Sequence, residues 1–141
     1  MSSLSGVPIH QGIAVTGSVN QKGKIQAIGG VNQKIEGFFD VCKTKGLTGR
    51  QGVLVPVANV KNLMLKREVV DAVEKGDFHI YQVATVEEGI QILTGKSVGV
   101  PDSDGHYPED SLYGLVQKKL KKYLDRARAL RVASDTDSAH P

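Results

Sequence analysis

The 141-residue chain has no tryptophan, a single cysteine and few aromatic residues, only 5% of the total. One thiol, Cys42, excludes an internal disulfide and is consistent with a reducing compartment. No apolar run approaches the ~20 residues that a membrane-spanning helix needs, and the N-terminus lacks the charged-then-apolar pattern of a secretory signal. We therefore expect a cytoplasmic protein without a membrane partner.

The sequence also lacks a pair of histidines at metal-ligand spacing and a large net positive charge. The four histidines, His10, His79, His106 and His140, are scattered, and no pair has the spacing of metal ligands. We therefore assign no metal site and interpret His10 and His79 as surface or strand residues. The net charge is only +3, well short of the dense basic patch that favours phosphate backbones. Nucleic acid is thus a disfavoured partner.

The composition is otherwise that of an ordinary globular domain, with 40% apolar and 23% charged residues. The chain is long enough to bury a core. Apolar residues alternate over 13–19 and return over 25–28, after a turn around Gly23. This pattern predicts a β-hairpin.

Three helices are predicted after the hairpin. Two cover 31–45 and 66–76, and each is closed by a glycine at its C-terminal end. Thr85 and Glu88 have the spacing of a capping box for the third helix, which Gly95 ends.

Short apolar runs over 52–57 and 78–83 predict buried strands, and a turn or short helix is expected over 58–65. A hairpin followed by alternating helices and strands is typical of an α/β or α+β layered architecture, and we expect an α+β domain. The domain is predicted to cover 1–96, followed by a linker over 97–110 that is rich in Gly, Pro and Asp.

A basic amphipathic helix is predicted over 111–133, followed by a disordered tail over 134–141. Its apolar stripe consists of Leu112, Val116, Leu120, Leu124 and Ala127, and its cations are Lys118, Lys119, Lys121, Lys122, Arg126, Arg128 and Arg131. Such a face could bind nucleic acid or an acidic membrane surface, but only Tyr113 and Tyr123 could offer an aromatic platform. We favour a solvated helix that packs its stripe on its own domain or on a neighbour.

Two possible chemical motifs do not meet their requirements. The TGKS segment at 94–97 resembles the end of a phosphate-binding loop, but five residues separate Gly89 from Gly95 where that loop has four. The segment also closes a helix instead of opening one. Cys42 lies on an apolar stripe without a residue placed to activate it, which indicates a buried structural thiol.

Lys34 is the residue whose position most needs an explanation. Val31, Ile35, Phe38 and Cys42 recur at helical spacing and predict the face that packs on the core. Lys34 lies on the same stripe in the first helical turn, where burial and the helix dipole both favour a neutral amine. A neutral amine can take a proton from a hydroxyl nucleophile, as in a Ser-Lys dyad. Alternatively, the side chain extends from the stripe edge into water.

The segment TGSVNQKGKIQAIGGVNQKIEGF resembles the core signature of the Lon protease proteolytic domain. The shared features are a Thr-Gly pair, a hairpin with a basic-Gly turn, a strand ending in Ile-Gly-Gly, and a lysine four residues beyond the second glycine. The similarity continues through SGVPI, GVLVPVANVKNL and FHIYQVATVEEGIQILTG, and so covers about residues 4–95. The segment DGHYPEDSLYGLVQKKL is similar to a bacterial Lon-like subgroup.

The resemblance implies the Lon proteolytic fold, with Lys34 as the base of a Ser-Lys dyad and Thr16 in a supporting role. In this family the nucleophilic serine lies at the start of the helix that precedes SGVPI. Ser2, Ser3 and Ser5 match later positions and inherit no role. We therefore expect a fragment that begins inside that helix, lacks the nucleophile and the ATPase module, and has no peptidase activity alone.

For the parent protein, the resemblance implies an ATP-dependent serine endopeptidase that degrades unfolded polypeptides. It also implies a homo-oligomer, commonly a hexameric ring, with ATP and Mg bound by the ATPase module and no cofactor in this chain. The alternative is a non-catalytic module that uses the basic helix at 111–133 for nucleic acid or a protein partner. The codons upstream of Met1 would distinguish the two.

Overall fold

The computed structural model describes the backbone of residues 1–137 and the side chains of residues 1–131. The chain divides into two units. The core unit is His10–Leu93, and the second unit joins Met1–Ile9 to the residues from Thr94 onward. The mixture of helices and strands confirms the predicted α+β class.

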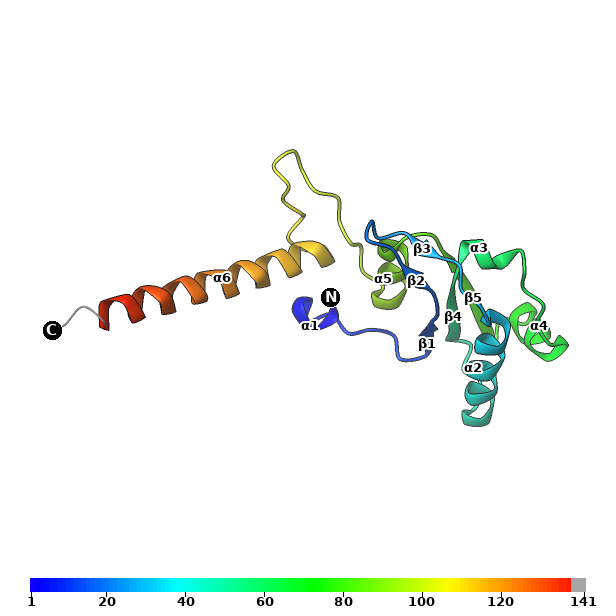
Figure 1. Ribbon diagram of the computed structural model, residues 1–141. Helices are drawn as coiled ribbons and strands as arrows, with labels where there is room; N and C mark the ends of the chain where they lie inside the picture. The colour runs from blue at the N-terminus through cyan, green and yellow to red at the C-terminus, as the bar shows by residue number, and fades with distance from the viewer. Residues whose placement is uncertain (138–141) are drawn as a thin grey trace. The chain divides into compact units, whose positions relative to one another are not determined.

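A three-stranded parallel sheet in the order β1-β4-β5 forms the centre of the core unit (Figure 1). Its strands are β1 (Ile13–Val15), β4 (Gln51–Pro56) and β5 (Phe78–Val83). Gly52 to Pro56 are all buried, as expected for a central strand that is covered on both faces. Gly52 pairs with His79, and an added Cβ at Gly52 would lie 2.5 Å from the His79 carbonyl oxygen. Only glycine fits at this point.

The predicted hairpin is correct only in its second half. β1 pairs in parallel with β4 and not with residues 25–28, so the hairpin prediction for 13–15 is wrong. The antiparallel pair consists of β2 (Ser18–Val19) and β3 (Ile25–Gln26). Thr16 still donates its backbone N–H to the Leu54 carbonyl at 3.0 Å, after which the chain leaves the parallel sheet. Alternation of apolar residues cannot reveal such a change of partner, because both pairings require the same period of two.

The prediction of a helix over 31–45 is confirmed by α2 (Val31–Lys45), which packs against β4. Gly30 precedes α2 with φ 67°, and Gly46 follows it with φ 91°. At both ends the backbone therefore adopts a conformation that favours glycine.

The remaining helices of this unit also follow the sequence pattern. They are α3 (Val57–Val60), α4 (Arg67–Glu74) and α5 (Val86–Thr94). At the start of α5, Thr85 Oγ1 accepts the Glu88 N–H at 3.3 Å. The Glu88 carboxylate accepts the N–H of Ala84 at 2.7 Å, one residue before the usual partner in a capping box.

The hydrophobic core lies between α2, α4 and the sheet. Its buried residues are Val31, Ile35, Phe39, Cys42, Val53, Val55, Val69, Ala72 and Phe78. The rings of Phe39 and Phe78 meet edge to face, with centroids 5.2 Å apart. This contact joins α2 to β5 and holds the helix on the sheet.

The second unit contains α1 (Ser2–Ser5) and α6 (Leu112–Asp137), which pack against each other. Residues 97–110 form neither helix nor strand. α6 continues four residues beyond the predicted end at 133, because no glycine or proline interrupts the chain between Gly114 and Pro141. The predicted disorder of 134–141 stays a prediction, and 138–141 lie outside the described residues.

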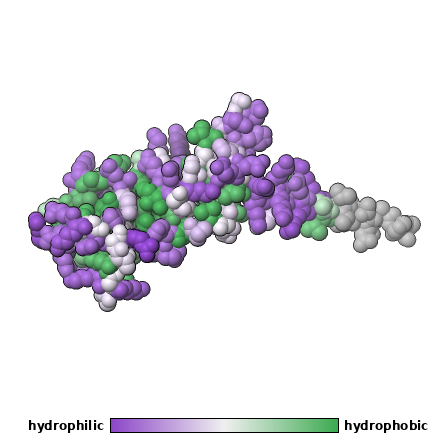
Figure 2. Space-filling view, turned by 180° about the vertical axis from the view of Figure 1, so that it is seen from behind, coloured by the Kyte–Doolittle hydropathy of each residue, from purple (hydrophilic) through white to green (hydrophobic). Residues whose placement is uncertain are grey.

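On the face that Figure 2 shows, α6 is mostly hydrophilic. Within residues 1–137, no helix combines the length and the apolar character that a membrane span would need.

Candidate functional site

Lys34 lies in the first turn of α2, and its side chain is exposed. With 3.6 residues per turn, Lys34 falls about a quarter-turn from the centre of the buried face formed by Val31, Ile35 and Phe39. Phe38, which the sequence assigned to the core face, is only partly buried. The prediction that Lys34 points inward is therefore wrong for this chain, because the core face is rotated toward Phe39. No salt bridge in the described chain involves Lys34.

The backbone that leads to Lys34 is tightly held. Asn59, which is 5% exposed, bonds Ile28 twice: its Oδ1 accepts the Ile28 N–H at 3.0 Å, and its Nδ2 donates to the Ile28 carbonyl at 2.9 Å. Gly30 then turns the chain into α2, and its carbonyl accepts the Lys34 N–H at 3.2 Å. The start of α2 is thus defined by a buried side chain and a glycine turn.

Thr16 lies at the end of β1 and is partly buried. Gly17 follows Thr16 and lies close to two side chains. A Cβ added to Gly17 would lie 3.3 Å from Ile25 and 3.4 Å from Pro56. In the described chain no hydrogen bond joins the Thr16 side chain to Lys34, so its supporting role stays a prediction.

The serines near the N-terminus take part in local bonds. Ser2 Oγ donates to the Val7 carbonyl at 2.6 Å, and Ser5 Oγ donates to the Ser2 carbonyl at 3.3 Å. These bonds stabilise the turn after α1. That Ser2, Ser3 and Ser5 carry no catalytic role stays a prediction.

The predictions for Cys42 and His79 agree with the structure. Cys42 is buried, and burial raises the pKa of its thiol although the nearby Lys45 ammonium partly lowers it. His79 lies in β5 with its Nε2 2.8 Å from the Gly49 carbonyl oxygen. His10 is exposed, and His140 lies outside the described residues. Among the described residues, no three His, Cys, Asp or Glu side chains are grouped as a metal site would require.

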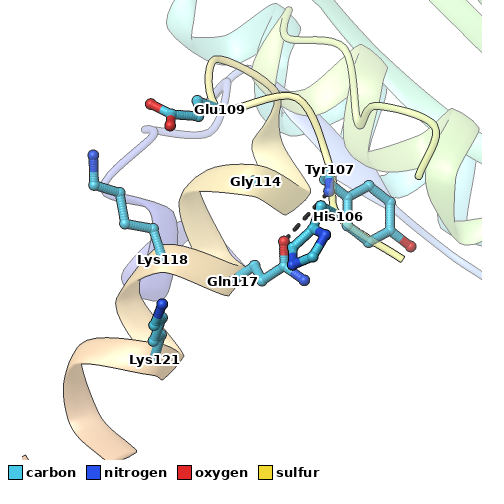
Figure 3. A pocket seen from close by; sticks show the side chains of 7 residues that line it. All are labelled: His106, Tyr107, Glu109, Gly114, Gln117, Lys118 and Lys121. Atoms are coloured by element: carbon cyan, nitrogen blue, oxygen red, sulfur yellow. Dashed lines mark hydrogen bonds between the residues drawn. The ribbon is translucent and has the colours of Figure 1, made fainter. Parts of the chain in front are cut away.

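The second unit contains a cavity of about 440 Å³ that the sequence did not predict (Figure 3). Gln117 of α6 holds the preceding loop here: its Nε2 donates to the Gly105 carbonyl at 3.2 Å, and its Oε1 accepts the Tyr107 N–H at 3.3 Å. The ammonium groups of Lys118 and Lys121 lie on one side of the cavity and His106 on the other (Figure 3). Such a cavity depends on a loop folding back onto a helix, which no sequence pattern shows. It is lined by neither Lys34 nor Thr16.

The comparisons with known proteins agree with the signature around Lys34. Residues 1–95 match the family model of the Lon protease (S16) C-terminal proteolytic domain. The chain belongs to this family. The sequence-based resemblance over residues 4–95 is thereby confirmed, and Lys34 lies within the matched region.

Individual Lon relatives extend this comparison. A Lon protease homolog of Haemophilus influenzae is 38% identical over 128 residues, which are 91% of this chain and 21% of that protein. A Lon protease homolog of Escherichia coli is 50% identical over 93 residues, 66% of this chain and 16% of that protein. The archaeal Lon protease of Archaeoglobus fulgidus is 30% identical over 91 residues, 64% of this chain and 13% of that protein. The chain thus spans about a fifth or less of the length of these relatives.

Proposed function

We propose that this chain is the C-terminal part of the proteolytic domain of an ATP-dependent serine endopeptidase, with Lys34 as the base of a Ser-Lys dyad. The match of residues 1–95 to the Lon proteolytic domain carries the proposal. The arrangement of a Gly-Gly turn, α2 and a lysine in its first turn supports the assignment of the base.

In the proposed reaction, the Lys34 amine accepts the proton of a serine hydroxyl while the serine oxygen attacks the peptide carbonyl. The same proton then passes to the leaving amine, and water hydrolyses the acyl-enzyme. Backbone N–H groups would stabilise the oxyanion. The serine belongs to a segment outside this chain, so the chain alone supplies the base without the nucleophile and is expected to be inactive.

The surface beside Thr16 supports a partner segment in the intact protein. Val15 and Val19 flank the Thr16-Gly17 pair, and they are 59% and 57% exposed. Burial of these two side chains against another segment would be favourable, because apolar surface would be removed from water.

The other properties of the parent protein follow from the same proposal. Substrates would be unfolded polypeptides, and the subunits would form a homo-oligomer, commonly a hexameric ring. ATP and Mg would be bound by an ATPase module outside this chain. The parent protein would be cytoplasmic. Thr16 would help to orient Lys34.

The proposal is tested in the full-length protein with Lys34→Ala and, as a control, Lys24→Ala. Lys34→Ala should abolish peptide cleavage while ATP hydrolysis continues, because only the base is lost. Lys24 is exposed and lies beside the turn of the β2-β3 hairpin, so its removal should change little. Normal cleavage by the Lys34 variant would refute the assignment of the base. Lys34-dependent labelling of the isolated chain by a serine-hydrolase probe would instead refute the expected inactivity of the chain alone.

A second candidate is a non-catalytic binding module that uses α6. The exposure of its cations favours this candidate: Lys118, Lys121, Lys122, Arg126, Arg128 and Arg131 are all exposed. Such a helix would bind a polyanion or an acidic protein partner, with an affinity that falls steeply as salt is added. Salt-dependent binding of α6 together with full activity of the Lys34 variant would favour this reading over the protease.

A further inference from the structure

Asn59 is a buried polar residue far in sequence from the segment that it bonds. It lies in α3, directly after the central strand β4, and is 5% exposed. Its amide makes two hydrogen bonds with one residue, Ile28, at 3.0 and 2.9 Å. An Asn side chain offers a donor and an acceptor together, so it can pair with both backbone groups of one residue as a neighbouring strand would.

The Ile28 backbone depends on this side chain. β3 ends at Gln26, and within the described residues Asn59 is the sole hydrogen-bond partner of the Ile28 N–H and carbonyl groups. Because Ile28 is partly buried, loss of the Asn59 amide would leave two polar groups with poor access to water. Asn59 therefore replaces strand pairing at the point where β3 has ended.

The residues between Ile28 and α2 cannot hold their own conformation. They are Gly29 and Gly30, and glycine has the largest backbone freedom of any residue. Gly30 has φ 67°, and its carbonyl accepts the N–H of Lys34. The direction in which α2 starts, and with it the position of Lys34, therefore depends on the fixed point at Ile28.

Three further hydrogen bonds join α2 to the segment that follows Asn59. Asn32 Oδ1 accepts the Met64 N–H at 3.1 Å, and Asn32 Nδ2 donates to the Asn62 carbonyl at 3.5 Å. Glu36 Oε1 accepts the Lys66 N–H at 2.9 Å. All three bonds are exposed to solvent, so each contributes less than the buried pair at Asn59. They show that one continuous segment positions the first half of α2.

We infer that Asn59 is a positioning residue for Lys34: its buried amide holds Ile28, so that the Gly29-Gly30 turn starts α2 in one orientation. Asn59 bonds neither Lys34 nor, in the proposed reaction, the substrate. The significance of Lys34 rests on the proposed function, whereas the bonds between Asn59 and Ile28 do not.

The first experiment follows backbone amides of the isolated chain by NMR. Asn59→Ala should shift the Ile28 to Lys34 signals and speed exchange at the Ile28 amide by about tenfold relative to the amides in the second half of α2. Val69→Ala is the matched control, because Val69 is a buried core residue of α4 that does not bond Ile28. It should speed exchange throughout the unit. Identical patterns for the two variants would overturn the inference.

A second variant, Asn59→Asp, gives a readout that a general loss of stability would not produce. A protonated carboxyl has one donor and one acceptor and reproduces the Asn59 amide, whereas a carboxylate has no donor for the Ile28 carbonyl. Burial raises the pKa of the new carboxyl. The Ile28 to Lys34 signals should therefore match the native chain at low pH and depart from it as pH rises. Signals that stay displaced at every pH, relative to the native chain at the same pH, would contradict the inference.

The third experiment separates this inference from the proposed function. In the full-length protein, Asn59→Ala should lower kcat for peptide cleavage by about 100-fold with little change in KM, since a displaced base impairs the chemical step. If Lys34→Ala does not affect cleavage, the proposed function fails while the NMR result for Asn59 stands. If Lys34→Ala abolishes cleavage and Asn59→Ala leaves kcat unchanged, the positioning role fails.

Discussion

Two helices with similar apolar periodicity, α2 and α6, have very different surroundings. In α2 the stripe is buried along the helix, with Ile35 fully buried and Phe39 only 1% exposed. In α6 the stripe is buried at Leu112 but reaches 49% exposure at Leu120 and 50% at Leu124. The difference arises because α2 lies on a three-stranded sheet, whereas α1, which packs against α6, is a helix of only four residues. Periodicity therefore predicts a helix but does not predict how much of its stripe is buried.

The largest expected effect tests the burial difference directly. Phe39→Ala should lower the free energy of unfolding by ~3–5 kcal/mol, because it removes a fully packed ring and leaves a cavity. Leu124→Ala, on the exposed part of α6, should change it by less than ~0.5 kcal/mol. Urea denaturation of both variants measures these values. A comparable loss for Leu124→Ala would mean that the stripe of α6 has a packing partner in solution.

The second prediction concerns the start of α2. Gly30 has φ 67°, so Gly30→Ala should cost ~1–2 kcal/mol by forcing a side chain into a left-handed backbone. Gly37 lies inside the same helix with open space around it, and Gly37→Ala should stabilise the chain by ~0.5–1 kcal/mol. Thermal unfolding of the two variants should therefore shift in opposite directions. Shifts in the same direction would contradict the αL assignment at Gly30.

The third prediction concerns charge on α6, whose lysines and arginines stand three and four residues apart. Like charges at these spacings, such as Lys118 with Lys122 and Lys122 with Arg126, destabilise a helix by about 0.2–0.5 kcal/mol per pair. Added salt screens this repulsion, so amide exchange in α6 should slow as salt rises while exchange in α2 changes little. An equal response of both helices would indicate a general salt effect.

The smallest expected effect is a pH dependence in the loop before α6. The backbone N–H groups of His106 and Asp104 hold the pKa of the Asp102 carboxyl below its usual value. The lowered pKa means that the carboxylate stabilises the loop fully above the unfolded-state pKa, and that this contribution is lost as pH falls through the lower folded-state value. NMR signals of the Asp104 and His106 amides should report this change. Asp102→Asn keeps an acceptor that does not titrate, so the change should be absent.

The sequence predicted α2 and β5 well because their signals are local. A glycine lies at each end of α2, and a short apolar run marks β5. The partner of β1 was predicted wrongly, because its alternation fits the β2-β3 hairpin and the parallel sheet equally well. The candidate site shows the same division: Lys34 was found from its spacing after Gly30, but its exposure was not foreseen. A helical stripe allows rotations of a fraction of a turn, and the packing of Phe39 on Phe78 determines which rotation occurs.

Asn59 shows why part of the site was beyond sequence reasoning. Its two bonds to Ile28 join residues 31 positions apart, and an asparagine in a turn after a strand has ordinary local explanations. By itself the sequence determined the family, the order of the helices and strands, and the place of Lys34 in the first turn of α2, because these depend on residue type and local spacing. Only the tertiary structure decided which strand β1 pairs with, that Lys34 faces solvent, and that a buried amide holds the turn before it. These features depend on contacts between segments far apart in the chain, and local propensity carries no information about such contacts.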